Sequence, residues 1–526
     1  MLDKLKLLGI LVAIPLISYL VLGWVSSKQE QEWRRALEQF VKNVPANRLD
    51  IYSLENACGN AQLAAKLDDV CSNFSNVHKI RTLALWACIG NVLFPLLVML
   101  AGAVCKANRK LLLAIFGPGL YISKIAISVL VIVQGIVLVG TIYYGEPALT
   151  GEIHIIPILG IGIASLTGAF YIISATFGLV KKAKTVVVGQ VVIAGEYPQL
   201  WQFVNDLAQK TNSDPPHNLV VGLTPNFFVT EANVRCLDGE LTGRTMYISA
   251  PLCRILTVEQ LSGVIAHELG HFKGADTKFS LKFYPIYQGA LDSLHSVAQA
   301  GHGGLIPAIY MLAFFLRCFA GAENKISRER EIAADAVAAE AVGALNIAAA
   351  LVKTAAFTSM WDHLTVVMQD SLKKGTITFD GKELDAQRFF SNVSNVFVYM
   401  VANNAEPKTL EGLDAKIIPH PTDSHPPLSV RLAALNTSLA EVGTDALNIS
   451  PEPPSSSKID KLEHLEMQLS MVQQLLLNPD QQRQFLEESG ETGIQACASC
   501  GAKVRPTADG RCPACQKAIT QGNSGQ

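Results

Sequence analysis

Four long apolar runs near the N-terminus limit what this 526-residue chain can fold into. They consist mainly of Leu, Ile, Val, Ala and Gly and cover residues 5–25, 83–104, 119–144 and 153–180. Runs of about 20 apolar residues are long enough for a helix to cross a hydrocarbon core of ~30 Å and are too long for core strands. A cleaved signal peptide, the alternative for the first run, has an apolar core of only about 7–15 residues. We therefore predict four retained transmembrane helices, the first in residues 1–25 and the others in residues 82–180.

The composition agrees with a membrane protein and argues against a polyanionic partner. Charged residues make up 17% of the chain and hydrophobic residues 49%, which is too apolar for a disordered chain. The 43 Lys and Arg nearly balance the 45 Asp and Glu, so the net charge of −2 gives no indication of nucleic-acid binding. At roughly 150 residues per domain, the length predicts three or four structural units. The lipid bilayer is the expected partner of the apolar region.

Basic residues beside the apolar runs predict their orientation, because Lys and Arg next to a span are retained on the cytoplasmic side. With four spans, three basic clusters lie on one side: Lys4 and Lys6, then Lys106, Arg109 and Lys110, then Lys181, Lys182 and Lys184. The loop at residues 145–152 has no Lys or Arg, which fits the opposite side. We therefore place residues 26–81 outside and the chain after residue 181 in the cytoplasm. Cys58 and Cys71, in the outer segment, form either a disulfide or two free thiols.

Residues 185–436 have the pattern of an α+β domain that is mainly helical. A strand pair or one long strand is expected at residues 185–195, followed by a helix and by β-rich runs at residues 218–224, 227–236 and 245–252. Thr257 begins the next helix, with Gln260 as its capping-box partner. The expected fold is a multi-span α-helical membrane region followed by a mainly helical domain with a small sheet.

The sequence HELGH on this helix places His267 and His271 four residues apart. Both imidazoles then project from one helical face, at the separation that two ligands of a tetrahedral zinc ion require. Glu268, next to the first histidine, is placed to take a proton from water that the metal activates. Taken alone, the motif also fits the solvated face of an amphipathic helix.

A third ligand is expected from a helix about 60 residues downstream of HELGH. In SRERE followed by IAAD, Glu331 and Asp335 share a helical face at i and i+4, and Ser327 is placed to cap this helix. One carboxylate can bind zinc while the other accepts the outward N–H of a ligand histidine and fixes its tautomer. A charged, Ala-rich surface helix is the alternative, which the upstream HELGH disfavours.

HELGH, SRERE-IAAD and a later HPPLSVR together resemble the motifs of membrane zinc endopeptidases of the HtpX type and of type I CAAX prenyl proteases, a branch of the gluzincins. The resemblance covers roughly residues 185–435 and implies one catalytic zinc ion. The implied zinc ligands are His267, His271 and Glu331, with Asp335 behind them. It also implies that Glu268 is the general base and then the acid, that His425 stabilises the oxyanion, and that Arg431 is a substrate or structural partner.

The activity that this resemblance implies is zinc-dependent hydrolysis of peptide bonds by an integral membrane metalloendopeptidase. The implied substrates are misfolded or membrane proteins, which are cleared in quality control at a bacterial cytoplasmic membrane. We expect a substrate strand to lie along residues 227–236, where a sheet edge would offer main-chain hydrogen bonds. CAAX processing does not follow from the shared motifs. The alternative is a membrane scaffold with a structural or vestigial metal site. The intact Glu268 argues against the scaffold, because a structural site has no use for a base.

One apolar run, residues 305–322, departs from the family pattern because it lies between His267 and Glu331. A single crossing there would put these two zinc ligands on opposite faces of the bilayer. The run is therefore a buried or interfacial helix, or it is one arm of a hairpin with residues 279–300. We favour the buried or interfacial helix, because polar residues make the other arm a poor span. These residues are Lys282, Asp292 and His295.

The end of the chain predicts a tethered tail with a second zinc site. Residues 448–490 are interpreted as a Pro- and Ser-rich linker and an amphipathic helix, which we expect to serve self-association or partner binding. Residues 496–516 resemble a zinc ribbon, because two CxxC knuckles each aim two thiolates at one structural zinc ion. The expected ligands are Cys497, Cys500, Cys512 and Cys515. Two disulfides are the alternative, which conflicts with the predicted cytoplasmic location.

Overall fold

The computed structural model describes most of the chain in separate stretches. The described residues are 2–40, 53–106, 108–174, 184–299, 306–413, 426–449, 454–477, 495–496 and 503–504. The chain divides into two compact units, which are described one at a time. The first unit comprises residues 1–181 and 286–323, and the second comprises residues 182–285 and 324–526.

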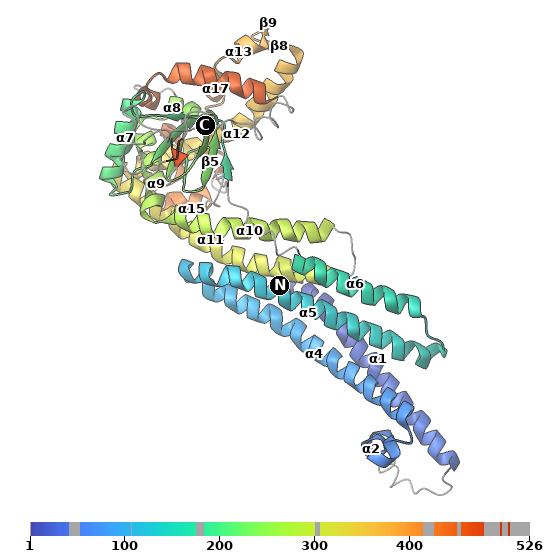
Figure 1. Ribbon diagram of the computed structural model, residues 1–526. Coiled ribbons are helices and arrows are strands. Elements are labelled where there is room, and N and C mark those ends of the chain that lie inside the picture. Colours follow the sequence, from blue (N-terminus) through green and yellow to red (C-terminus); the bar gives the residue numbers. More distant parts are fainter. Residues whose placement is uncertain are drawn as a thin grey trace, which may run out of the picture. The chain divides into compact units, whose positions relative to one another are not determined.

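Four long helices dominate the first unit and confirm the four predicted spans (Figure 1). They are α1 (Leu2–Phe40), α4 (Asp68–Cys105), α5 (Arg109–Thr150) and α6 (Ile155–Ser174). Each is long and apolar enough to cross a membrane, and large apolar side chains such as Trp86 and Leu100 face outward rather than into a core. The helices α1 and α4 extend well beyond the apolar runs, so much of the expected outer segment is helical. Two short helices, α2 (Leu54–Gly59) and α3 (Ala61–Ala64), lie between them.

A proline inside α1 explains a buried polar contact between α1 and α4. Pro15 has no backbone N–H, so the carbonyl of Leu11 loses its usual partner one turn later in the helix. The Nδ2 group of Asn91 on α4, which is fully buried, donates a hydrogen bond to this carbonyl at 2.8 Å. Asn91 therefore satisfies a carbonyl group that would otherwise lie unpaired in an apolar environment.

Replacing Asn91 by Leu is expected to destabilise the first unit by about 1 kcal/mol, the usual scale for a hydrogen bond between membrane helices. The measurement is thermal unfolding of the purified chain in detergent. Pro15→Ala supplies the matched background, because it returns an N–H donor to the Leu11 carbonyl within α1. The loss caused by Asn91→Leu should shrink in that background. An equal loss in both backgrounds would contradict this role of Asn91.

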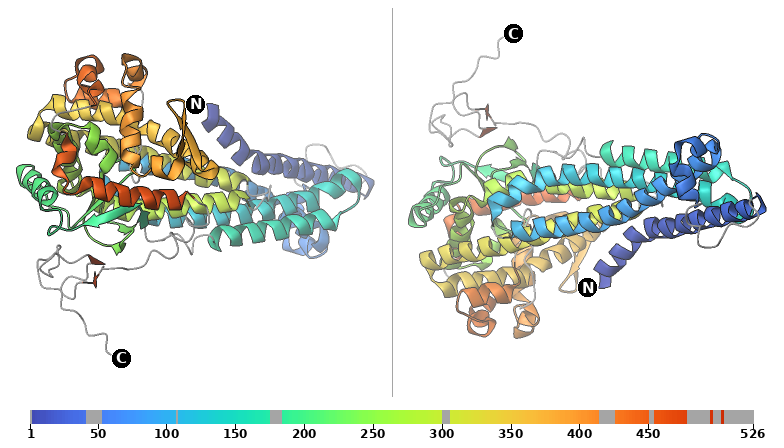
Figure 2. Two further views of the ribbon diagram at one scale, coloured as in Figure 1. Left: turned by 90° about the horizontal axis from the view of Figure 1, so that it is seen from above. Right: turned by 90° about the horizontal axis from the view of Figure 1, so that it is seen from below.

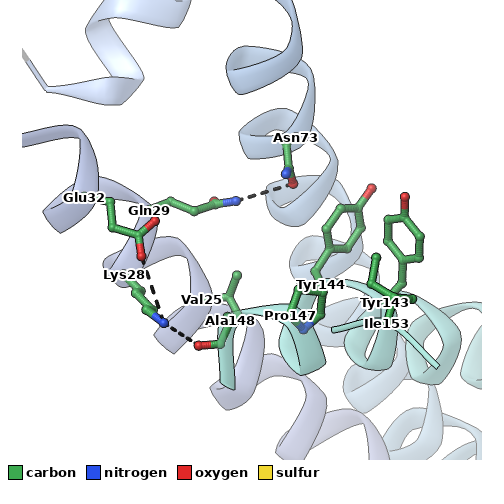
Figure 3. A pocket seen from close by; sticks show the side chains of 10 residues that line it. All are labelled: Val25, Lys28, Gln29, Glu32, Asn73, Tyr143, Tyr144, Pro147, Ala148 and Ile153. Carbon is green, nitrogen blue, oxygen red and sulfur yellow. Dashed lines mark hydrogen bonds and ion pairs between the residues drawn. The ribbon is translucent and has the colours of Figure 1, made fainter. Parts of the chain in front are cut away.

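Contacts at one end of these helices join the segments that the sequence places outside. Gln29 on α1 donates to Asn73 on α4 at 3.4 Å, and Lys28 donates to the carbonyl of Ala148 on α5. A pocket of about 310 Å³ opens between them (Figure 3), and it is lined by Val25, Lys28, Gln29, Glu32, Asn73, Tyr143, Tyr144, Pro147, Ala148 and Ile153. Cys58 and Cys71 form a disulfide in this outer segment, the first of the two possibilities left open by the sequence.

The apolar run at residues 305–322 lies in α11 (Ile306–Val342) and has buried side chains such as Met311, Phe315 and Phe319, as the favoured interpretation of a buried or interfacial helix expects. In the chain, α11 is the second arm of a helical hairpin. Its arms are α10 (Asp276–Gln299) and α11, and residues 286–323 of the hairpin group with the first unit. Phe116 of α5 contacts both arms, because its ring lies 6.1 Å from that of Tyr287 on α10 and 5.9 Å from that of Phe315 on α11. The polar residues that argued against this arm lie on its exposed side: Lys282, Asp292 and His295.

The helix α11 continues without interruption through the SRERE sequence. Ser327 is therefore an interior, buried helix residue and not the cap that the sequence suggested. Because α10 leaves the second unit and α11 returns to it, His267 and Glu331 both belong to the second unit. Among the described residues, neither α10 nor α11 is one of the helices that are long and apolar enough to cross a membrane.

The second unit contains small sheets, as expected. Its four-stranded sheet has the order β2-β3-β7-β4, with β2 (Gly189–Val192), β3 (Asn218–Gly222), β4 (Phe228–Thr230) and β7 (Thr245–Ser249). Only the β3–β7 pair among these is parallel. A three-stranded sheet contains β1 (Lys184–Val186), β5 (Asn233–Cys236) and β6 (Gly239–Leu241). The expected strand at residues 185–195 is thus divided between two sheets.

Helices make up most of the second unit (Figure 2). The bounds are α7 (Pro198–Lys210), α8 (Ala250–Ile255), α9 (Val258–Lys273), α12 (Ala344–Lys374), α13 (Ala386–Phe389), α14 (Val393–Ala402), η3 (Pro407–Leu410), α15 (Leu428–Ala434), α16 (Leu439–Leu447), η5 (Ser455–Lys458) and α17 (Leu462–Leu476). A hairpin of β8 (Thr376–Phe379) and β9 (Lys382–Asp385) follows α12. The main core lies between α7, α9, α12, α14 and the four-stranded sheet.

Residues 454–477 pack against this unit, which corrects the expectation of a linker followed by a free amphipathic helix. The Ser455 hydroxyl donates to the carbonyl of Cys253 at 2.7 Å, and Leu465 and Leu469 of α17 are fully buried in the main core. Glu466, also fully buried, accepts a hydrogen bond from Nε of Arg254 at 2.8 Å. The face of α17 that carries Leu465 and Leu469 is therefore buried against the chain's own domain, while Met467, Met471 and Leu475 on the same helix are exposed.

Candidate metal centre

The helix α9 starts where the sequence predicts and carries the two histidines into the interior. The Thr257 hydroxyl accepts the backbone N–H of Gln260 at 3.0 Å, and the Gln260 side chain accepts the N–H of Thr257 at 3.1 Å. This capping box satisfies two donors at the helix start. Both histidines are almost completely buried, so the alternative of a solvated amphipathic face is excluded.

The glycine of HELGH allows α9 and α11 to approach closely. A Cβ atom at Gly270 would lie 3.2 Å from the Cα of Ala334 on α11, which is closer than most real contacts of this kind. Ala334 lies one turn after Glu331 on the same helix. The missing side chain at Gly270 thus lets the Glu331 carboxylate reach the histidine pair.

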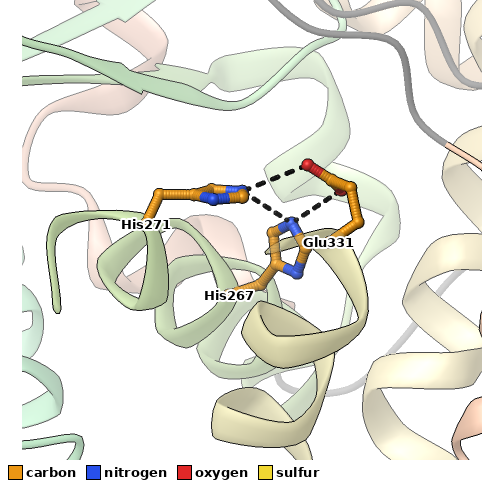
Figure 4. A group of neighbouring side chains, drawn as sticks. All are labelled: His267, His271 and Glu331. Atoms are coloured by element: carbon orange, nitrogen blue, oxygen red, sulfur yellow. Dashed lines mark hydrogen bonds and ion pairs between the residues drawn. The ribbon is translucent and has the colours of Figure 1, made fainter. Parts of the chain in front are cut away.

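Three side chains meet at one point in this interior (Figure 4). His267, His271 and Glu331 each offer a ligand atom, and these atoms all lie within 4.8 Å of one another. The Nε2 atoms of the two histidines are 3.3 Å apart, and each lies 3.5 Å from an oxygen of Glu331. Two imidazoles and one carboxylate are the donor set of catalytic zinc sites, so these residues fit that ion. Of the two carboxylates that the sequence left open, Glu331 is therefore the one placed as a ligand.

Asp335 contacts Nδ1, the ring nitrogen of His267 that lies away from Glu331. Its Oδ1 lies 2.9 Å from Nδ1 of His267, and its Oδ2 accepts a hydrogen bond from Nε of Arg431 at 2.8 Å. Burial acts to raise the pKa of Asp335, but the Arg431 guanidinium and the contact with His267 outweigh it and lower this pKa to about 2. An ionised Asp335 accepts a hydrogen bond from Nδ1–H of His267, which leaves Nε2 of the ring free for a metal. Arg431 itself is 2% exposed, and its role as a substrate or structural partner stays a prediction.

A second carboxylate lies behind His271, and the sequence did not indicate it. Oδ2 of Asp276, at the start of α10, is 3.2 Å from Nδ1 of His271, and its Oδ1 is 3.0 Å from Nε of Arg330. The only available signal was an acidic residue five positions after the second histidine. That position lies beyond the end of α9, where helical periodicity no longer predicts which side chains meet.

Glu268 is buried beside the histidines, as its expected role requires. One of its oxygens, Oε2, is inaccessible to solvent and has no hydrogen-bond partner among the described residues. A buried carboxylate oxygen without a donor is costly, and it suits a group that receives a proton during a reaction. The other expected site residue, His425, lies outside the described residues, as do the four cysteines of the tail.

Comparisons with known proteins agree with this geometry. Residues 196–439 match the sequence model of Peptidase family M48. This segment is therefore similar to peptidases of family M48, and it contains an intact His-His-Glu set. The matched residues include all of α9 and the part of α11 that carries Glu331, so the resemblance seen in the motifs extends over the domain.

Several curated relatives are named Protease HtpX homolog. The one from Gemmatimonas aurantiaca is 30% identical over 182 residues, which cover 31% of this chain and 60% of the relative. The one from Thermococcus kodakarensis is 24% identical over 254 residues, covering 47% of this chain and 76% of the relative. The one from Archaeoglobus fulgidus is 36% identical over 85 residues, covering 16% and 23%. The chain thus spans less than two thirds of some of these relatives, and no solved structure matches it.

Proposed function

We propose that the chain is a membrane-anchored, zinc-dependent endopeptidase that cleaves misfolded or membrane proteins. The convergence of His267, His271 and Glu331 beside the buried Glu268 carries this proposal. The names of the HtpX-homolog relatives support the reaction type. The four long apolar helices of the first unit support action at a membrane, where proteins of that class would be within reach.

The mechanism assigns a separate task to each side chain. Zinc held by His267, His271 and Glu331 would polarise a peptide carbonyl and activate water for attack. Glu268 takes a proton from the attacking water at its carboxylate and returns it to the leaving amine nitrogen. Asp335 keeps the Nδ1 proton of His267 in place, while Arg431 keeps Asp335 ionised. His425 is proposed to donate a hydrogen bond to the developing oxyanion, from the family resemblance alone.

The substrate is proposed to bind as an extended strand along β4. In the four-stranded sheet β4 is an end strand paired only with β7, so its other edge can offer backbone hydrogen bonds. The substrate-binding region that the sequence placed at residues 227–236 is thereby reduced to β4, because β5 belongs to the other sheet. Main-chain recognition gives little sequence preference, which suits a protease that clears varied proteins.

The catalytic domain is proposed to face the cytoplasm of a bacterial inner membrane. Cys58 and Cys71 form a disulfide, a bond that persists in oxidising compartments. The opposite end of α4 and α5 carries the basic residues Lys106, Arg109 and Lys110. The helix α6 begins near the disulfide-bearing end and runs 20 residues, so the chain after it continues on the basic side.

The tail is proposed to end in a structural zinc ribbon. The strands β10 (Gln495–Ala496) and β11 (Lys503–Val504) pair in an antiparallel fashion. This pairing brings together the two ends of the segment that contains Cys497 and Cys500, as a zinc knuckle requires. Cys512 and Cys515 would complete the site.

Removing the metal tests the proposed activity. The purified full chain in detergent is expected to cleave casein, to lose at least about 100-fold of this activity after chelation, and to regain it when zinc is added. Reconstitution with zinc, compared with a mock-treated sample, controls for irreversible unfolding. Cleavage that persists after the metal is gone would exclude the mechanism. A chain that binds zinc but cleaves nothing would favour the scaffold alternative.

A further inference from the structure

Each of the two histidines has an aspartate next to its Nδ1 atom. One aspartate comes from α11 and the other from α10. Asp335 contacts His267 and is paired with Arg431, while Asp276 contacts His271 and is paired with Arg330. Both arginines are at least nine-tenths buried. Buried charges are unfavourable unless paired, and each of these aspartates has a buried arginine as its partner.

The turn between α9 and α10 is shaped so that Asp276 reaches back to His271. Ala275 has a φ of 54°, a left-handed conformation that side-chain-bearing residues seldom adopt. A Cβ atom at Gly274 would lie 2.8 Å from Oδ2 of Asp276. The Thr277 hydroxyl donates to Glu231, which follows β4, at 2.8 Å. This strained turn and its attachment hold the Asp276 carboxylate at the histidine ring.

Arg330 immediately precedes the proposed ligand Glu331 on α11, and its side chain contacts Asp276. Its guanidinium also lies 5.4 Å from the ring centre of Phe279 and 3.4 Å from the hydroxyl of Ser280, both on α10. These contacts join the first turns of α10 to α11. The Arg330 side chain thus links the part of α11 that carries Glu331 to Asp276, which contacts His271.

We propose that Asp276 and Arg330 are positioning residues that orient His271 for zinc, as Asp335 and Arg431 orient His267. This inference rests on the proposed function of the same site. A carboxylate at Nδ1 fixes the tautomer with Nε2 free and increases the basicity of the ligand. Both zinc-binding imidazoles are then oriented by an aspartate with its own arginine, and the second pair belongs to the hairpin formed by α10 and α11.

Zinc affinity of the full chain tests this proposal without relying on turnover. Affinity is measured by competition with a chromophoric chelator, in a common background in which the four tail cysteines are replaced by serine. Asp276→Asn and Arg330→Met are each expected to weaken zinc binding about 10- to 100-fold. The matched controls are the exposed residues of the same type, changed by Asp362→Asn and Arg328→Met, which should bind zinc like the parent.

Three further measurements separate positioning from a general structural effect. The double variant should lose less affinity than the product of the two single losses, because the pair acts as one unit. Arg330→Lys, which keeps a positive charge, should recover part of the affinity lost in Arg330→Met. The zinc-free variants should unfold at the temperature of the zinc-free parent.

The proposal is overturned if Asp276→Asn binds zinc within twofold of the parent. It is also overturned if the loss of affinity follows an equal loss of stability in the zinc-free chain, or if the two changes act independently. In each of these cases the parent still binds zinc. Failure of the proposed function is a different result, since the parent itself would then bind no zinc in the cysteine-free background.

Discussion

Replacing Glu268 by Gln is expected to abolish peptide hydrolysis while zinc binding is retained. The amide has nearly the same shape but cannot accept the proton that the attacking water must lose. General acid–base catalysis contributes about 100- to 10,000-fold to a rate, so a loss of this size is expected in kcat. Glu268 is not one of the three converging ligands, and the zinc content should therefore remain at the level of the unmodified chain. Cleavage of casein and the bound metal are measured on the same preparation.

Glu259→Gln is the matched control for this substitution. Glu259 lies on the first turn of the same helix and is exposed, so the same loss of charge there should leave the rate unchanged. If Glu268→Gln cleaved casein at the rate of the unmodified chain with the same zinc content, Glu268 would not be the base. The proposed mechanism would then be wrong even though the metal site exists.

Ending the chain after Asn448 is expected to unfold the second unit. This truncation removes Ile459, Leu462, Leu465 and Leu469 from the main core. Burying each such side chain contributes about 1.5–3 kcal/mol, so their joint loss is comparable to the whole stability of a typical domain. It also leaves Arg254 without its buried partner Glu466. Thermal unfolding in detergent and resistance to a protease provide the measurement.

A truncation after Leu477 is the control, because it keeps η5, α17 and their contacts while removing the proposed ribbon. We expect this shorter chain to unfold at nearly the temperature of the full chain. Equal unfolding temperatures for the two truncations would show that residues 454–477 do not stabilise the domain. Any effect of the second truncation on activity then reports on the last 49 residues separately from folding.

The sequence was informative where one short segment contains the whole signal. Uniform apolar runs predicted α1, α4, α5 and α6, because a helix that crosses a bilayer needs only length and composition. HELGH predicted two ligands and a base, because residues four apart on a helix share a face. The ExxxD spacing predicted that Glu331 and Asp335 would act together, but it did not say which one faces the metal.

The sequence failed where the answer depends on distant partners. Ser327 looked like the start of a helix, but α11 already begins at Ile306, and only the structure shows that the two stretches form one helix. The segment around Ser455 looked like a linker because Pro and Ser do not form a core. Ser455 donates hydrogen bonds to the carbonyls of Cys253 and Leu256, some 200 positions away, and no local pattern contains them.

By itself, then, the sequence determined the helices, the zinc-ligand types and the chemistry they suit, because these follow from local spacing and residue type. Only the tertiary structure decided that Glu331 converges with the two histidines, that Asp335 contacts His267 from the other side together with the buried Arg431, and that Asp276 and Arg330 lie next to His271. These choices are set by close approaches such as that of Gly270 to Ala334. A contact of this kind depends on how two helices cross, and that crossing results from the packing of the whole domain.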